Sequence, residues 1–114
     1  VVFKLMPNIY KNAKKDLTST SVTTLYTAPA LTTSIVKSII VSEDSGNADT
    51  ITVTITDAEA SPAVFSLFKT KSISANGTTE LLTSPIVVQT GEILKVTAAT
   101  ANRLHVVASI LEVS

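Results

Sequence analysis

Residues 50–56 read Thr-Ile-Thr-Val-Thr-Ile-Thr, seven residues in which hydroxyl and aliphatic side chains alternate without a break. Because successive side chains of an extended strand point to opposite faces, the aliphatic residues share one face and the four threonines share the other. β-Branched side chains lose χ1 freedom in a helix and fit a pleated surface, so the local preference agrees with the pattern. The segment predicts a half-buried β-strand.

The rest of the chain repeats this pattern between turn signals. We expect strands or short extended pieces at residues 22–27, 33–42, 49–56, 63–70, 73–82, 85–88, 92–98 and 104–113. The polar segment 43–49 is expected to close a hairpin between the second and third of these, and Asn76-Gly77 suits a type I′ turn. Only residues 7–16 are expected to form a helical turn. About eight short strands without a helical period predict an all-β fold, an antiparallel β-sandwich of jelly-roll or immunoglobulin-like type.

Size and composition favour one domain without thiol chemistry. The chain has 114 residues and no cysteine, which leaves the redox compartment open. Hydrophobic residues make up 45% but aromatic residues only 4%, so we expect a core of Val, Ile, Leu and Ala. Aliphatic runs such as Ile39-Ile40-Val41 are far too short to cross a bilayer, and residues 1–6 are too short for a secretory signal.

The charges are balanced overall but unevenly distributed. Four lysines, Lys4, Lys11, Lys14 and Lys15, and one aspartate give residues 1–20 a net charge of +3, whereas the other five basic and eight acidic residues leave the remainder at −3. We therefore expect an extended basic N-terminal arm at residues 1–20, which docks on a partner or is simply a solvated terminus, and a sandwich domain at residues 21–114. The zero net charge argues against direct binding of nucleic acid through a general positive field.

Two predicted strands are apolar on both faces. Counting alternation along residues 35–41 puts Val36, Ser38 and Ile40 on one face and Ile35, Lys37, Ile39 and Val41 on the other. In the last strand Leu104, Val106, Ala108 and Ile110 share one side, and His105, Val107, Ser109, Leu111 and Val113 share the opposite side. A two-layer sandwich buries only one face of each sheet. Either another subunit or the N-terminal arm, folded back, must therefore cover the outer apolar face. We favour a subunit, with Ile35, Ile39, Val41, Val107 and Leu111 as contact residues.

No segment of the sequence assembles a reactive centre. His105 is the single histidine and no Gly-x-Ser-x-Gly elbow accompanies it, so we expect it to pack at a sheet surface or interface. Residues 43–49 carry oxygen ligands suited to calcium, but the spacing is not that of an EF-hand and an ordinary turn needs the same residues. Asp57 and Glu59 lack an aromatic sugar platform for a glycosidase. We expect no enzymatic activity, no cofactor and no metal.

Several segments support a comparison with a known group. Thr23-Thr24-Leu25-Tyr26-Thr27-Ala28-Pro29, followed by residues 32–41, resembles the opening of many small virion structural proteins of tailed bacteriophages. Gly91-Glu92-Ile93-Leu94-Lys95-Val96 and the closing residues 104–113 resemble their later part. The likeness covers most of residues 22–113 and rests on strand and turn patterns. Ala30 stands where such proteins often have glycine, and residues before 20 lie outside the pattern.

The resemblance implies a non-enzymatic β-sandwich subunit, located in the virion, that packs into a symmetric particle. We expect first a capsid cement or decoration protein, whose partners are the major capsid protein or other copies of itself. The alternative is a neck, tail or fibre-associated subunit with neck or tail proteins as partners. An alternative of another class is a carbohydrate-binding sandwich module, although the predicted loops offer mostly Ser, Thr, Asn and Asp.

Overall fold

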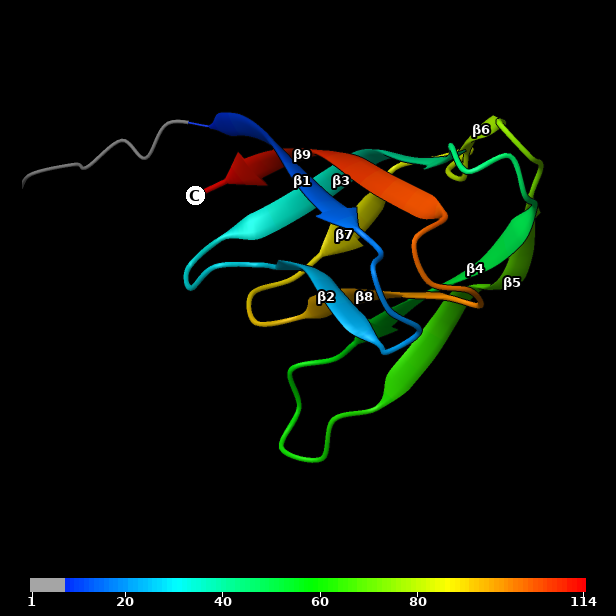
Figure 1. Cartoon of the computed structure of the whole chain (residues 1–114). Coiled ribbons are helices and arrows are strands. Elements are labelled where there is room, and N and C mark those ends of the chain that lie inside the picture. Colours follow the sequence, from blue (N-terminus) through cyan, green and yellow to red (C-terminus); the bar gives the residue numbers. More distant parts are fainter. Residues whose placement is uncertain (1–7) are drawn as a thin grey trace, which may run out of the picture.

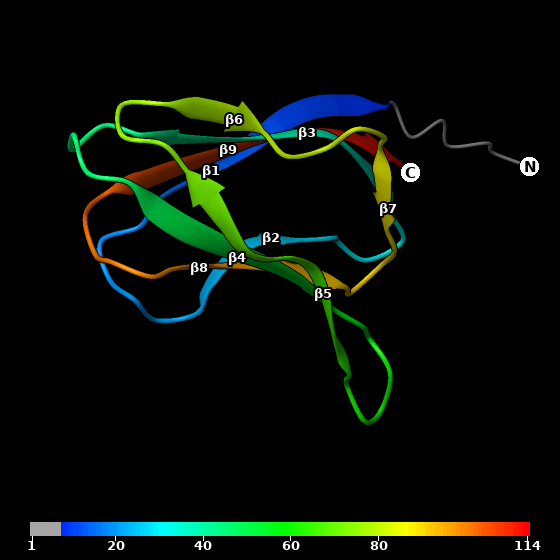
Figure 2. The same cartoon turned by 90° about the vertical axis from the view of Figure 1, so that its right-hand side faces the viewer.

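The computed structural model describes residues 8–114, which form nine β-strands and no helix (Figure 1). The strands are β1 (Ile9–Asp16), β2 (Thr23–Thr27), β3 (Thr33–Glu43), β4 (Asp49–Thr56), β5 (Val64–Ile73), β6 (Thr78–Glu80), β7 (Ile86–Val88), β8 (Ile93–Ala98) and β9 (Leu104–Val113). They make two antiparallel sheets packed face to face, which confirms the predicted all-β sandwich (Figure 2). In the part of the chain that the structure describes, no helix has the length and apolar character needed to cross a membrane.

The order of the strands decides between the two expected sandwich types. One sheet has the order β1-β9-β3-β6, with β7 also paired to β3, and the other has the order β2-β8-β4-β5. Because β6 and β7 pair with successive parts of β3, they act as one interrupted strand. Counted this way, the sheets hold four strands each, and most connections cross from one sheet to the other. This is the topology of a jelly roll and not that of an immunoglobulin domain.

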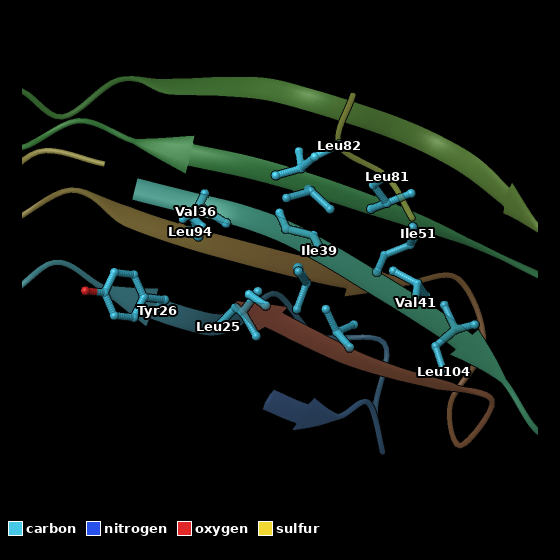
Figure 3. Packing of buried hydrophobic residues seen from close by; sticks show 14 of the residues in the cluster. Leu25, Tyr26, Val36, Ile39, Val41, Ile51, Leu81, Leu82, Leu94 and Leu104 are labelled. Carbon is cyan, nitrogen blue, oxygen red and sulfur yellow. The ribbon is translucent and has the colours of Figure 1, made fainter. Parts of the chain in front are cut away.

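The core lies between the sheets and is aliphatic, as the composition predicts (Figure 3). β4 contributes Ile51 and Val53, which are fully buried, whereas Thr52 and Thr54 between them are partly exposed. The alternation read from residues 50–56 is thus confirmed up to Thr54, whereas at the end of the strand Ile55 is partly exposed and Thr56 is buried. Complete burial of such aliphatic side chains contributes roughly 1.5–3 kcal/mol each.

A β-bulge in β3 changes which residues face the core. Val36 lies opposite Ile110 and Ser38 lies opposite Ser109, so Lys37 is an extra residue on the β3 side. After the bulge the alternation is shifted by one residue: Ile39 and Val41 are 0% exposed, and Ile40 is 39% exposed. The assignment of Ile39 and Val41 to an outer face is therefore wrong, because it counted strict alternation through an irregular position.

Residues 9–16 are part of the sandwich. The helical turn expected there is wrong: all eight residues of β1 pair with β9, and Leu17 after them is buried and donates its N–H to the carbonyl of Leu104. A strand at this position satisfies its backbone groups on one side through β9 and extends the sheet edge. The folded body thus begins before the boundary expected at residue 20, and Lys4 lies outside the described residues.

The segment between β3 and β4 crosses between sheets, so the expected hairpin there is wrong. Its conformation is held by Glu43, which is 2% exposed. The Glu43 carboxylate accepts hydrogen bonds from the Ser45 N–H (2.7 Å), the Ser45 hydroxyl, the Gly46 N–H (3.1 Å) and the Asn76 N–H (2.9 Å). One buried side chain therefore joins the β3–β4 turn to the β5–β6 turn. In that second turn only Asn76 has a positive φ (54°), so it is not the expected type I′ turn.

A buried polar cluster joins the sheets at the opposite end of β3. The Tyr26 hydroxyl of β2 lies 2.6 Å from the Ser34 hydroxyl and donates to Glu112 Oε2 of β9 at 2.5 Å. Lys11 Nζ of β1 lies 3.5 Å from the same Glu112 oxygen. Burial, reinforced by the hydrogen bond to the Glu112 carboxylate and by its charge, raises the pKa of Tyr26 from 10.0 to about 12.

This cluster makes stability sensitive to alkaline pH. Because the folded-state pKa of Tyr26 is raised, the contribution of its neutral form is fully present below about pH 10 and is lost as pH rises towards about 12. We expect Tyr26→Phe to remove this loss of stability at alkaline pH. At neutral pH the substitution should lower the free energy of unfolding by about 1–3 kcal/mol, since Glu112 loses a buried donor. Urea unfolding of both proteins between pH 8 and pH 11 measures the effect. If the variant lost as much unfolding free energy as the wild type when the pH rises, the role assigned to Tyr26 would be contradicted.

Candidate interaction surface

One sheet presents an outward surface whose composition follows from its register. We call the outward-facing residues of β1, β9, β3, β6 and β7 the outer face. Its first row runs across four strands: Tyr10 lies opposite Leu111, Leu111 opposite Ile35, and Ile35 opposite Val87. Side chains directly opposite each other on neighbouring strands are close enough to touch. The four residues thus form a continuous apolar row, and Tyr10 and Val87 at its two ends are 74% and 53% exposed.

Two rows farther along the same strands, the third row of the outer face mixes apolar and charged residues. Lys14 lies opposite Val107, Val107 opposite Ile40, and Ile40 opposite Glu80. Val107 and Ile40 are 38% and 39% exposed. Lys14 at one edge and Glu80 at the other therefore flank two exposed aliphatic side chains with opposite charges.

The second row, between these two, is polar and contains the bulge. Asn12 lies opposite Ser109, and both Lys37 and Ser38 stand on the β3 side of Ser109. Lys37 Nζ lies 5.9 Å from the centre of the Tyr10 ring, within the range of a cation–π contact. Tyr10, Lys11, Asn12, Lys37, Ser109 and Ile110 line a shallow open hollow of about 380 Å³.

Glu80 is held in place at the edge of the outer face. Its carboxylate accepts hydrogen bonds from the Ser38 hydroxyl, the Ile39 N–H (2.9 Å) and the Leu82 N–H (3.2 Å). Burial alone would raise the pKa of Glu80, but these hydrogen bonds outweigh it and lower the pKa. Glu80 thus occupies the gap between β6 and β7 and stays ionised at neutral pH.

The fourth row contains the single histidine. His105 lies opposite Asp16 on β1 and opposite Ser42 on β3. Its Nε2 is 3.3 Å from Asp16 Oδ1 and its Nδ1 is 3.4 Å from Asp44 Oδ2. Both ring nitrogens therefore lie close to carboxylate oxygens, one on β1 and one in the β3–β4 turn. This arrangement fits a residue on a sheet surface that links β1 and the β3–β4 turn to β9.

The carboxylates of residues 43–49 do not converge on a common point. Glu43 is saturated by the N–H and hydroxyl donors described above, and Asp49 Oδ2 accepts from the Thr100 N–H at 3.1 Å. Within residues 8–114 no group of three or more His, Cys, Asp or Glu side chains is placed to hold a metal ion.

The structure brings together some of the residues named from sequence and separates others. Ile35, Val107 and Leu111 lie on the outer face with Lys14, whereas Ile39 and Val41 lie in the core. Lys11 is on the inner side of β1, where its ammonium forms an ion pair with Glu112. Lys15 is exposed on the same edge strand. Sequence reasoning missed Tyr10, Ile40 and Val87. A strand assignment for residues 9–16 would have found Tyr10, since it alternates with Lys11.

Comparison with known proteins gives no independent identification. No protein-family model matches the sequence, and no curated protein matches it.

Proposed function

We propose that this protein is a non-enzymatic structural subunit of a phage virion, a capsid cement or decoration protein that stabilises the particle through subunit contacts. The observation that supports this is the outer face. The outer face carries Ile35, Ile40, Val87, Val107 and Leu111, with Tyr10, and the described part of the chain leaves them partly or largely exposed. Apolar patches of this kind mark sites of protein–protein contact.

Two further observations support the proposal. Charged residues make up only 16% of the chain, fewer than in an ordinary soluble domain, which suits a protein that acts through its contacts. The jelly-roll topology occurs in viral capsid domains, but also in lectins and cupins. The fold is therefore compatible with a capsid protein but does not by itself identify one. The resemblance of residues 22–113 to small phage virion proteins favours the first of these.

A second candidate function is a carbohydrate-binding module. It is supported by the hollow at Tyr10, where an exposed aromatic ring adjoins the Asn12 amide, the Ser109 hydroxyl and the Lys37 ammonium. Such a group of an aromatic platform and convergent polar atoms is typical of small-ligand sites. The hollow is open and shallow, however, which suits a flat protein contact better than a sugar ring.

Labelling of particles distinguishes the two candidates. With a gold-conjugated antibody against this chain, we expect regular labelling of virions purified from the virus that encodes it. Unlabelled virions, with the protein confined to the soluble fraction, would contradict the proposal. Binding of the purified protein to a glycan array that is lost in Tyr10→Ala would support the carbohydrate module instead.

A further inference from the structure

We propose that the outer face binds the outer face of a second copy of this chain, about a two-fold axis that runs parallel to the strands between β9 and β3. The inference rests on the proposed function, since it names the neighbour that covers this surface. Such an axis exchanges β9 with β3 and β1 with β6 and β7, and it keeps every row opposite its own counterpart. Isologous contacts of this kind are the commonest in homo-oligomers.

The first row is self-complementary under this rotation. Tyr10 of one copy meets the partner's Val87, and Leu111 meets the partner's Ile35. The two-fold axis repeats both contacts, so all eight side chains of the two rows lose water against other apolar side chains. Removal of apolar surface from water is the main favourable term in such an association.

The third row adds matched charges. Val107 meets the partner's Ile40, and Lys14 meets the partner's Glu80. Hydrogen bonds from Ser38, Ile39 and Leu82 fix the Glu80 carboxylate against β3, so the partner's Lys14 would approach it there. Opposite charges at both edges of the contact fix its register and disfavour other alignments.

The remaining rows place no like charges opposite each other. Ser109 meets the partner's Ser38, and Asn12 on β1 faces the gap between the partner's β6 and β7. Asp16 meets the partner's Thr78, and His105 meets the partner's Ser42. Lys37 starts on β3 and its ammonium lies over the Tyr10 ring on β1, so its aliphatic stem crosses β9 within the contact and its charge lies at the edge strand.

A two-fold axis in the plane of the sheet but perpendicular to the strands gives a poorer match. It would put Tyr10 against the partner's Asp16 and Leu111 against the partner's His105, so apolar side chains would meet charged ones. Burying a charge against an apolar group costs free energy without compensation. The parallel axis is therefore the arrangement that the register favours.

The size of the surface sets the expected strength. Four strands about 4.8 Å apart and four rows about 6.7 Å apart span roughly 14 by 20 Å. Even with corrugated side chains this is below the roughly 800 Å² per partner of a standard interface. We therefore expect a weak dimer that forms at high concentration, or at the high local concentration of an assembled particle.

A mixing experiment tests the two-fold geometry. We expect wild-type protein to dimerise in sedimentation velocity as its concentration rises to about 1 mM, and Val107→Glu or Ile40→Lys alone to weaken the dimer at least ~10-fold. An equimolar mixture of the two variants should recover dimer. In the mixed dimer the introduced carboxylate of one copy faces the introduced ammonium of the other across the axis, and the second Val107–Ile40 contact is intact. Val64→Glu, at a 62% exposed valine on β5 outside the outer face, is the control and should not change dimerisation.

Several outcomes would overturn the inference. Wild-type protein that stays monomeric at about 1 mM, variants that dimerise normally, or a mixture that recovers nothing would each do so. Circular dichroism of every variant verifies that it remains folded. If virions carry the antibody label but the mixture does not recover dimer, the structural role stands and only the self-contact fails.

Discussion

Ile39→Lys is expected to abolish folding, whereas Ile40→Lys, one residue along the same strand, leaves the protein folded. Ile39 is 0% exposed between the two sheets, so a lysine there buries a charge without a partner, and we expect a loss of more than about 4 kcal/mol. Ile40 is 39% exposed and points away from the core. Its substitution should change the free energy of unfolding by less than about 1 kcal/mol.

Urea unfolding followed by circular dichroism measures this contrast. Equal destabilisation by the two substitutions would show that the bulge at Lys37 does not shift the alternation of β3. The reverse order, with Ile40 as the sensitive residue, would restore the faces read from the sequence and remove Ile40 from the proposed dimer contact.

Glu43→Ala is expected to destabilise both turns that the Glu43 carboxylate joins. The substitution leaves the N–H groups of Ser45, Gly46 and Asn76 without their acceptor. Because each orphaned donor is costly, we expect the unfolding midpoint to fall by roughly 10 °C or more. Differential scanning calorimetry measures it. Glu59→Ala, at an exposed carboxylate in the β4–β5 loop, is the matched control and should leave the midpoint within about 2 °C of the wild type.

The same carboxylate should make the protein sensitive to acid. Burial would raise the pKa of Glu43, but hydrogen bonds from Ser45, Asn76 and Gly46 outweigh it and lower the pKa from 4.5 to about 2. The stability that the ionised form contributes is therefore fully present above about pH 4.5 and is lost as pH falls towards about 2. We expect the difference in unfolding free energy between wild type and Glu43→Gln to shrink across this window. A difference that is constant between pH 7 and pH 2.5 would show that Glu43 is not held as an acceptor.

The proposed site could be predicted from sequence only in part. Alternation in residues 104–113 placed Val107 and Leu111 on the outer side, because β9 is regular throughout. The same rule of alternation failed in β3, because nothing in the sequence Val36-Lys37-Ser38 indicates an extra residue. Tyr10 was missed because the lysine-rich segment around it has weak strand preference, and its pairing with β9 supplies the order that local propensity does not.

The sequence by itself determined that this chain is all-β, where most strands begin and end, and that Thr52 and Thr54 of β4 face outward. Those properties are local: they depend on β-branched side chains, period-two alternation and turn residues within a few positions. Only the tertiary structure decided the jelly-roll order, the bulge at Lys37 and the rows that make the outer face self-complementary. Each depends on which distant strand supplies the hydrogen-bonding partner, and that choice is made by packing of the whole core.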